Sequence, residues 1–234
     1  TKTIQNGKTA SYTYNGDGLR MSKTVDGKTT KHIWDGTNIV GDVTDGTVTK
    51  YIRGLQLISS KNGSNENFYT YNGHGDVVQL TNSTGAITKQ YNYDAFGVET
   101  NKTNNDTNPF RYCGEYYDIE TDSVYLRARY YQPTTGRFIT EDPINDGLNW
   151  YAYCGNEPVM SIDPLGLYTL EYDENGNVYA VIDLNVGDTL FNIAQAEVGN
   201  GYDWVKMGYS GDPGCLQDGE LVNITGIYNN KYPN

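Results

Sequence analysis

A short pattern repeats along the first half of the chain: an alternating stretch ends in an aromatic residue that is followed by Asn or Asp. Copies stand at Tyr14-Asn15-Gly16, Trp34-Asp35-Gly36, Tyr71-Asn72-Gly73 and Tyr93-Asp94. The steps between them are 20, 37 and 22 residues, which fits a period near 20 with one degenerate copy. Hairpins of this size cannot bury their own faces, so we expect successive copies to stack. The repeat predicts a meandering β-sheet that winds up or closes on itself.

The residues between the copies support this prediction. The runs 27–34 and 86–93 alternate as a strand with one buried face requires. Asn-Gly and Asp-Gly pairs suit two-residue hairpin turns, which need positive φ, and they stand at 6–7, 26–27, 35–36, 45–46, 62–63 and 72–73. With 22 Tyr and 27 Gly among 234 residues, the composition favours strands and turns over a helical bundle. No apolar run approaches the roughly 20 residues of a membrane span.

The acidic charge is concentrated toward the C-terminus. The formal net charge is −12, and the residues from Tyr168 onward include 10 acidic and 2 basic side chains. An acidic tail repels phosphate backbones, which argues against a nucleic-acid partner. The chain opens at Thr1 within repeat-like sequence, so we expect a piece of a longer protein whose export signal lies elsewhere.

The residues that most often bind metals are few and scattered. The chain has three cysteines and two histidines, and their spacing is not typical of metal ligands. They are Cys113, Cys154, Cys215, His32 and His74. We therefore expect no metal site and no cofactor, and a zinc site or a Cys–His nucleophile pair is disfavoured. The cysteines are predicted to be buried or free thiols.

Several motifs resemble those of RHS-type proteins. The stretch 14–36 is similar to a YD repeat, while YLRARYY at 125–131, GRFITEDP at 136–143 and IDPLGL at 162–167 resemble the RHS repeat-associated core. In that family, YD repeats spiral as antiparallel strands into a hollow β-shell whose end is plugged by the core. The shell holds a variable C-terminal segment, often a toxin. The resemblance thus implies a mainly β fold and a secreted or cell-surface bacterial protein.

The resemblance also implies a domain organisation. YD repeats would occupy residues 1–110, the core 111–167 and the variable region 168–234, which contains a small α+β module at about 181–224. From the residues themselves we expect a strand hairpin at 168–183 and a closing strand at 219–224.

Two aspartates that precede proline, Asp142 and Asp163, are the candidate catalytic residues. In one interpretation both are turn or cap residues at strand exits, where Asp is common. In the other, the fold brings the carboxylates together, and because like charges in contact cannot both ionise, they share a proton. One carboxylate can then activate water while the other protonates the carbonyl or the leaving group.

The resemblance favours the second interpretation, because RHS cores of this type are similar to aspartyl autoproteases that act on themselves. It places the cut just after the Asp-Pro-x-Gly-Leu element, between Leu167 and Tyr168. Arg137 stands five residues before Asp142 and could orient a carboxylate or stabilise developing charge, or it could simply be a surface strand arginine.

The C-terminal segment resembles a second family, the LysM module, which has a βααβ fold and binds N-acetylglucosamine polymers such as peptidoglycan. The resemblance rests on Gly187-Asp188-Thr189-Leu190, Ile193-Ala194, Tyr202-Asp203-Trp204 and Gly219-Glu220-Leu221. It assigns the sugar groove to Gly187, Asp188, Thr189, Pro213, Gly214, Cys215 and Leu216. The alternative is that these residues cap a helix and fill a small core.

Two functions remain open at this point. The chain is either the plug end of an RHS shell that encloses its own C-terminal segment and releases it by autoproteolysis, or a non-enzymatic cell-surface shell held to peptidoglycan by its tail. A toxic activity of the tail itself is a weaker third hypothesis, because the tail lacks an obvious nucleophile and base.

Overall fold

The computed structural model describes residues 2–5, 7–103, 106–142, 149–166, 170–172, 175, 177–181 and 221–224. The chain divides into two compact units. The first contains residues 1–128 and 132–134, and the second contains residues 129–131 and 135–234.

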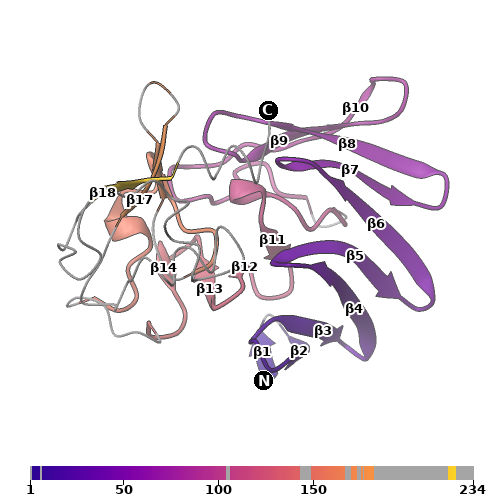
Figure 1. Ribbon diagram of the computed structural model, residues 1–234. Coiled ribbons are helices and arrows are strands. Elements are labelled where there is room, and N and C mark those ends of the chain that lie inside the picture. Colours follow the sequence, from indigo (N-terminus) through magenta and orange to yellow (C-terminus); the bar gives the residue numbers. More distant parts are fainter. Residues whose placement is uncertain are drawn as a thin grey trace. The chain divides into compact units, whose positions relative to one another are not determined.

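A ten-stranded antiparallel sheet dominates the first unit, and its strands lie in sequence order from β1 to β10. Figure 1 shows them following one another along an arc, from indigo β1 to magenta β10. Their bounds are Lys2–Gln5, Lys8–Tyr14, Arg20–Val25, Lys28–Asp35, Asn38–Thr44, Thr47–Arg53, Leu57–Asn62, Asn65–Tyr71, Val77–Thr81 and Ile87–Gln90. The predicted meander is therefore confirmed.

Two-residue hairpin turns occur where they were predicted at Asp26-Gly27 and Asp45-Gly46. All four of these residues have positive φ, between 49° and 87°. At 35–36 and 62–63 the turn is shifted by one residue, because the strand register pairs Asp35 with Asn38 and Asn62 with Asn65. The turns there begin at glycine.

The predicted hairpin turn at 72–73 is wrong, and a longer loop stands there instead. Four loops of one kind begin at Asn15, Asn72, Asn82 and Asp94. In each, a side-chain oxygen of the first residue accepts the backbone N–H groups two and four residues later, at 2.8–3.1 Å. The fourth residue of each loop is a glycine with φ between 79° and 92°. In three of the four copies of the repeat, at Asn15, Asn72 and Asp94, the Asn or Asp is thus the residue that closes the loop.

The interior of the first unit contains aromatic and charged side chains as well as aliphatic ones. Strands β11 (Tyr116–Asp118) and β12 (Ser123–Leu126) supply partners for the sheet. The buried Asp42 carboxylate accepts hydrogen bonds from the hydroxyls of Tyr51 and Tyr116, each at 2.9 Å. It also accepts one from His32 Nδ1 at 2.6 Å. Through Tyr116, this polar network connects the ten-stranded sheet to β11.

The buried ring of His32 makes the stability of the first unit depend on pH. Burial lowers the pKa of His32 and outweighs its hydrogen bond to Asp42, while Arg20 donates to His32 Nε2 at 3.1 Å and also disfavours the charged ring. The unfolded chain takes up a proton near pH 6.5, whereas the folded chain does so only at lower pH. Stability is therefore present above about pH 6.5 and is lost as the pH falls, by at most about 1.4 kcal/mol per pH unit.

Urea unfolding at about pH 7.5 and 5.5 measures this loss directly. We expect a lower midpoint at the acidic pH and a flatter pH dependence in His32→Gln. An equal pH dependence in both proteins would assign the effect to other groups.

The second unit contains β13 (Arg129–Gln132) as far as Tyr131, β14 (Arg137–Phe138) and a four-stranded sheet in the order β15-β16-β17-β18. The strands of this sheet are Ser161–Ile162, Leu170–Tyr172, Val178–Val181 and Leu221–Asn223. The antiparallel pairing of β16 with β17 confirms the predicted hairpin, and β18 is the predicted closing strand. The residues expected to form the helices of the LysM-like module lie outside the described part of the chain.

Aromatic rings form the core near β13 and β14. Tyr131 stacks on Tyr153 with ring centroids 3.9 Å apart, and Phe138 meets both rings edge to face. Within the described residues, no helix is long and apolar enough to cross a membrane.

Candidate active site

Asp142 and Asp163 lie against one guanidinium group. Arg129 Nη1 is 2.6 Å from Asp142 Oδ2, and Arg129 Nη2 is 3.5 Å from Asp163 Oδ2. All three side chains are buried, with relative exposures of 3–5%. The structure therefore brings the two sequence-predicted aspartates to one site, although they are 21 positions apart.

Backbone groups and one aromatic ring hold Arg129 in place at the start of β13. Its Nε donates to the carbonyl of Gly166 at 2.6 Å, and its Nη1 to the carbonyl of Trp150 at 3.4 Å. The guanidinium carbon lies 3.6 Å from the centroid of the Phe138 ring. The backbone N–H of Asp142 donates to the same Trp150 carbonyl at 3.0 Å. The geometry of this cluster is thus set by the backbone as well as by charge.

The electrostatics of the site follow from its burial. One guanidinium faces two carboxylates, so one negative charge is uncompensated among these three groups unless a proton is bound. Cys154 lies in this environment, and burial together with the Asp163 carboxylate raises the pKa of its thiol well above the usual range. A thiol held in the protonated form is a poor nucleophile.

Of the two roles predicted for Arg137, its position fits that of a surface strand arginine. Its exposed side chain donates from Nη1 to Asn149 Oδ1 at 3.1 Å, and the cation that contacts both aspartates is Arg129. Sequence reasoning missed Arg129, which lies within the YLRARYY run at 125–131. Its signal was a basic residue in a run of otherwise apolar and aromatic residues, although its neighbour Arg127 carries the same signal.

The other predicted site residues lie outside the described part of the chain. Leu167 and Tyr168, at the predicted cut, lie outside the described residues, and so do all the predicted sugar-groove positions: Gly187, Asp188, Thr189, Pro213, Gly214, Cys215 and Leu216. The described residue nearest the predicted cut is Gly166, whose carbonyl binds Arg129.

The long hairpin meander defines a YD-repeat β-shell protein. The chain belongs to the Teneurin YD-shell family, whose model matches residues 37–159.

Related proteins include bacterial toxins. The tRNA nuclease WapA of Bacillus subtilis (strain 168) is 40% identical over 181 residues, which cover 71% of this chain and 8% of that protein. Toxin protein Tse5 of Pseudomonas aeruginosa is 35% identical over 95 residues, covering 40% of this chain and 7% of that protein. The crystal structure of TcdB2-TccC3-TEV shares the fold, with a TM-score of 0.57 at 24% identity over 70% of this chain and 9% of that one. This chain therefore spans only a small part of each protein.

Proposed function

We propose that this chain is the C-terminal end of a secreted or cell-surface YD-shell that encloses its own C-terminal segment and releases it by cutting between Leu167 and Tyr168. The observation that carries the proposal is the buried Asp142–Arg129–Asp163 cluster. Arg129 also binds the Gly166 carbonyl, so the cluster is attached to the segment that leads into the predicted cut.

The chemistry needs one proton shared by the two carboxyl groups. The ionised carboxylate takes a proton from water, whose oxygen adds to the carbonyl carbon of Leu167. The protonated partner gives its proton to the amide nitrogen of Tyr168, and the carbon–nitrogen bond breaks. The products are a carboxylate at residue 167 and an amine at residue 168.

A route through a covalent intermediate is disfavoured. The Cys154 thiol, which lies beside Asp163, is buried and its pKa is raised, so the thiolate needed for attack is scarce there. Water activated by a carboxylate needs no such nucleophile.

The alternative of a wall-bound shell is not favoured by the comparisons, because two of the similar proteins are described as a nuclease and a toxin. Peptidoglycan binding by residues 181–224 stays a prediction. The same holds for the expectation that the tail avoids nucleic acid.

Lysine substitution at the two arginines tests the proposed role of Arg129. Arg129→Lys keeps the charge but loses the planar fork that reaches both carboxylates, so we expect cleavage to slow by at least about 10-fold. Arg137→Lys is the matched control, and its rate should equal that of the unsubstituted chain. The readout is the rate at which the C-terminal product appears on a gel, with N-terminal sequencing to show that it begins at Tyr168. Equal rates in the two variants would remove Arg129 from the mechanism.

A further inference from the structure

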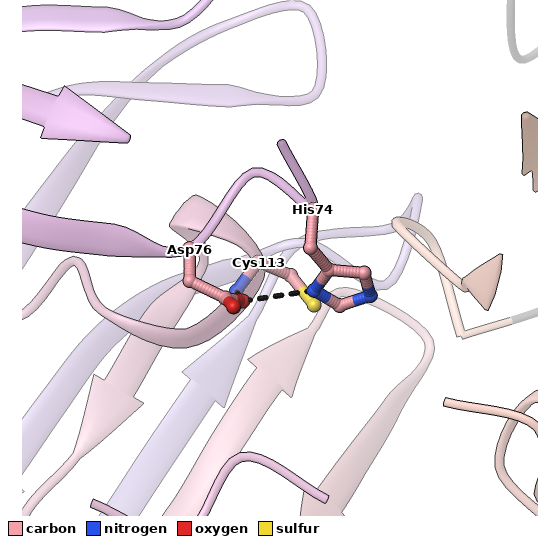
Figure 2. Close-up of side chains that lie close together, drawn as sticks. All are labelled: His74, Asp76 and Cys113. Carbon is pink, nitrogen blue, oxygen red and sulfur yellow. Dashed lines mark hydrogen bonds and ion pairs between the residues drawn. The ribbon is translucent and has the colours of Figure 1, made fainter. Parts of the chain in front are cut away.

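Three side chains of different chemistry meet in the first unit: two come from one loop, and the third stands 37 positions farther along the sequence. His74 Nδ1 lies 3.0 Å from Asp76 Oδ1, and the donor atoms of His74, Asp76 and Cys113 all lie within 4.8 Å of one another. Figure 2 shows the Cys113 sulfur on the same side of the ring as Nδ1, the nitrogen that faces Asp76. Nitrogen, oxygen and sulfur donors thus lie close together.

The loop that carries His74 and Asp76 does not need either side chain for its own structure. It is one of the four loops described above, and the residue at the Asp76 position is Leu19, Ala86 or Val98 in the other three. These loops close with the same backbone hydrogen bonds although they have no carboxylate there. Another requirement must account for Asp76.

Cys113 comes to the cluster from a separate turn, Tyr112–Gly114. Its φ of 52° is left-handed, a conformation that is unfavourable for a residue with a side chain. A second Tyr-Cys-Gly turn holds Cys154 with a φ of 48°, but that cysteine is buried while Cys113 is partly exposed. Of these two similar turns, the first presents its sulfur to a histidine and a carboxylate.

Neighbouring groups orient the donors. Asn72 Nδ2 donates to Asp76 Oδ2 at 2.8 Å, which leaves Oδ1 facing His74. The backbone N–H of Cys113 donates to Asp76 Oδ1 at 2.9 Å and joins the two segments. In metal sites, the ligand side chains are typically held in place by hydrogen bonds of this kind from neighbouring groups.

The arrangement does not suit a Cys–His–Asp relay. In a relay, the acid binds one ring nitrogen and the thiol faces the other, whereas here the carboxylate and the sulfur lie at the same edge of the ring. It does suit a metal ion, because all ligands must point at one centre. In a tetrahedral zinc site with bonds of about 2.0–2.3 Å, the ligand atoms lie about 3.3–3.8 Å from one another. The donor atoms here lie within 4.8 Å of one another, so the longest of these distances must shorten by about 1 Å. The His74 side chain, 17% exposed, can supply part of that movement.

We propose that His74, Asp76 and Cys113 form a zinc site with three protein ligands and one open position. Imidazole, thiolate and carboxylate together match the ligand preferences of Zn²⁺. The ion would join the 72–76 loop to the 112–114 turn. The sequence disfavoured a zinc site because the cysteine stands 39 positions from the histidine, and only the fold brings them together.

Cobalt(II) titration of the full chain tests this proposal, because cobalt bound by a thiolate absorbs in the near ultraviolet. The protein carries Cys154→Ala and Cys215→Ala, so Cys113 is its one remaining cysteine. We expect the thiolate–cobalt band to saturate at one equivalent and to disappear when Zn²⁺ is added. In this background, Cys113→Ser should abolish the band and His74→Gln should weaken binding at least about 10-fold.

Thr84→Gln is the matched control, because Thr84 occupies the His74 position in the loop that begins at Asn82. Its cobalt affinity should be unchanged. Circular dichroism establishes that each variant is folded. Absence of the band in the folded parent, or an undiminished affinity in folded His74→Gln, would overturn the proposal. A second readout is the melting temperature, which Zn²⁺ should raise in the parent and leave unchanged in Cys113→Ser.

Discussion

A chain carrying Asp163→Asn, or Asp142→Asn, is expected to stay intact under conditions in which the unsubstituted chain cuts itself. Each substitution keeps the shape of the side chain and removes a carboxyl group that contacts Arg129. An amide can neither take a proton from water nor deliver one to the leaving nitrogen, so the rate should fall by roughly 10²–10⁴-fold. The measurement is the fraction of full-length chain remaining over time at neutral and mildly acidic pH.

Glu141→Gln is the matched control for this pair. Glu141 adjoins Asp142 in sequence, but its side chain is exposed and accepts a hydrogen bond from the Tyr151 hydroxyl at 3.1 Å. Its loss should leave the rate unchanged. If Glu141→Gln slows cleavage as much as Asp142→Asn does, the effect comes from local charge and the pair has no special role.

Removal of the Asp118 carboxylate is expected to produce the largest loss of stability in the first unit. Asp118 is fully buried and forms ion pairs with Arg20 and with Lys23. Arg20 is also fully buried, and its guanidinium carbon lies 4.3 Å from the Tyr125 ring centroid and 5.0 Å from that of Tyr116. Asp118→Ala leaves the buried Arg20 charge without this ion-pair partner, which should lower the free energy of unfolding by about 3–5 kcal/mol.

Two further variants establish that the loss comes from the stranded charge. Replacing both partners, with Arg20→Met and Asp118→Leu, should recover much of the stability, because the buried Arg20 charge is then removed together with its partner, while Lys23 keeps its ion pair with Glu120. Asp45→Asn is the control, since Asp45 pairs with Lys28 at 3.4 Å on the exposed surface and Asn tolerates its positive φ. Urea unfolding gives all three values. A loss in Asp118→Ala no greater than that in Asp45→Asn would contradict this account.

Local sequence signals predicted the sheet well, because the geometry of a hairpin is set by neighbouring residues. The Asp26-Gly27 and Asp45-Gly46 turns lie where the dipeptides placed them. The hairpin expected at 72–73 failed, because the Asn72 side chain binds two backbone N–H groups farther along the loop. A dipeptide rule does not include that bond. The interior also escaped prediction, because partners such as Arg20 and Asp118 are 98 positions apart.

Only part of the candidate site could be predicted from the sequence. Two Asp-Pro steps, at 142–143 and 163–164, indicated the acidic residues, but spacing alone suggested Arg137 as the cation. Arg129 takes that place because β13 directs it into the unit, where Phe138 and the Gly166 carbonyl hold it. Contacts of this kind depend on how strands pack. The convergence of His74, Asp76 and Cys113 has the same origin.

Intact-mass spectrometry of the freshly folded, unsubstituted chain tests the central claim most directly. The account predicts two new masses, those of residues 1–167 and 168–234, and their absence from Asp163→Asn treated in the same way. A folded chain that stays whole, or one that cuts at another peptide bond, would contradict it. Equal cleavage in the unsubstituted chain and in Asp163→Asn would contradict it as well.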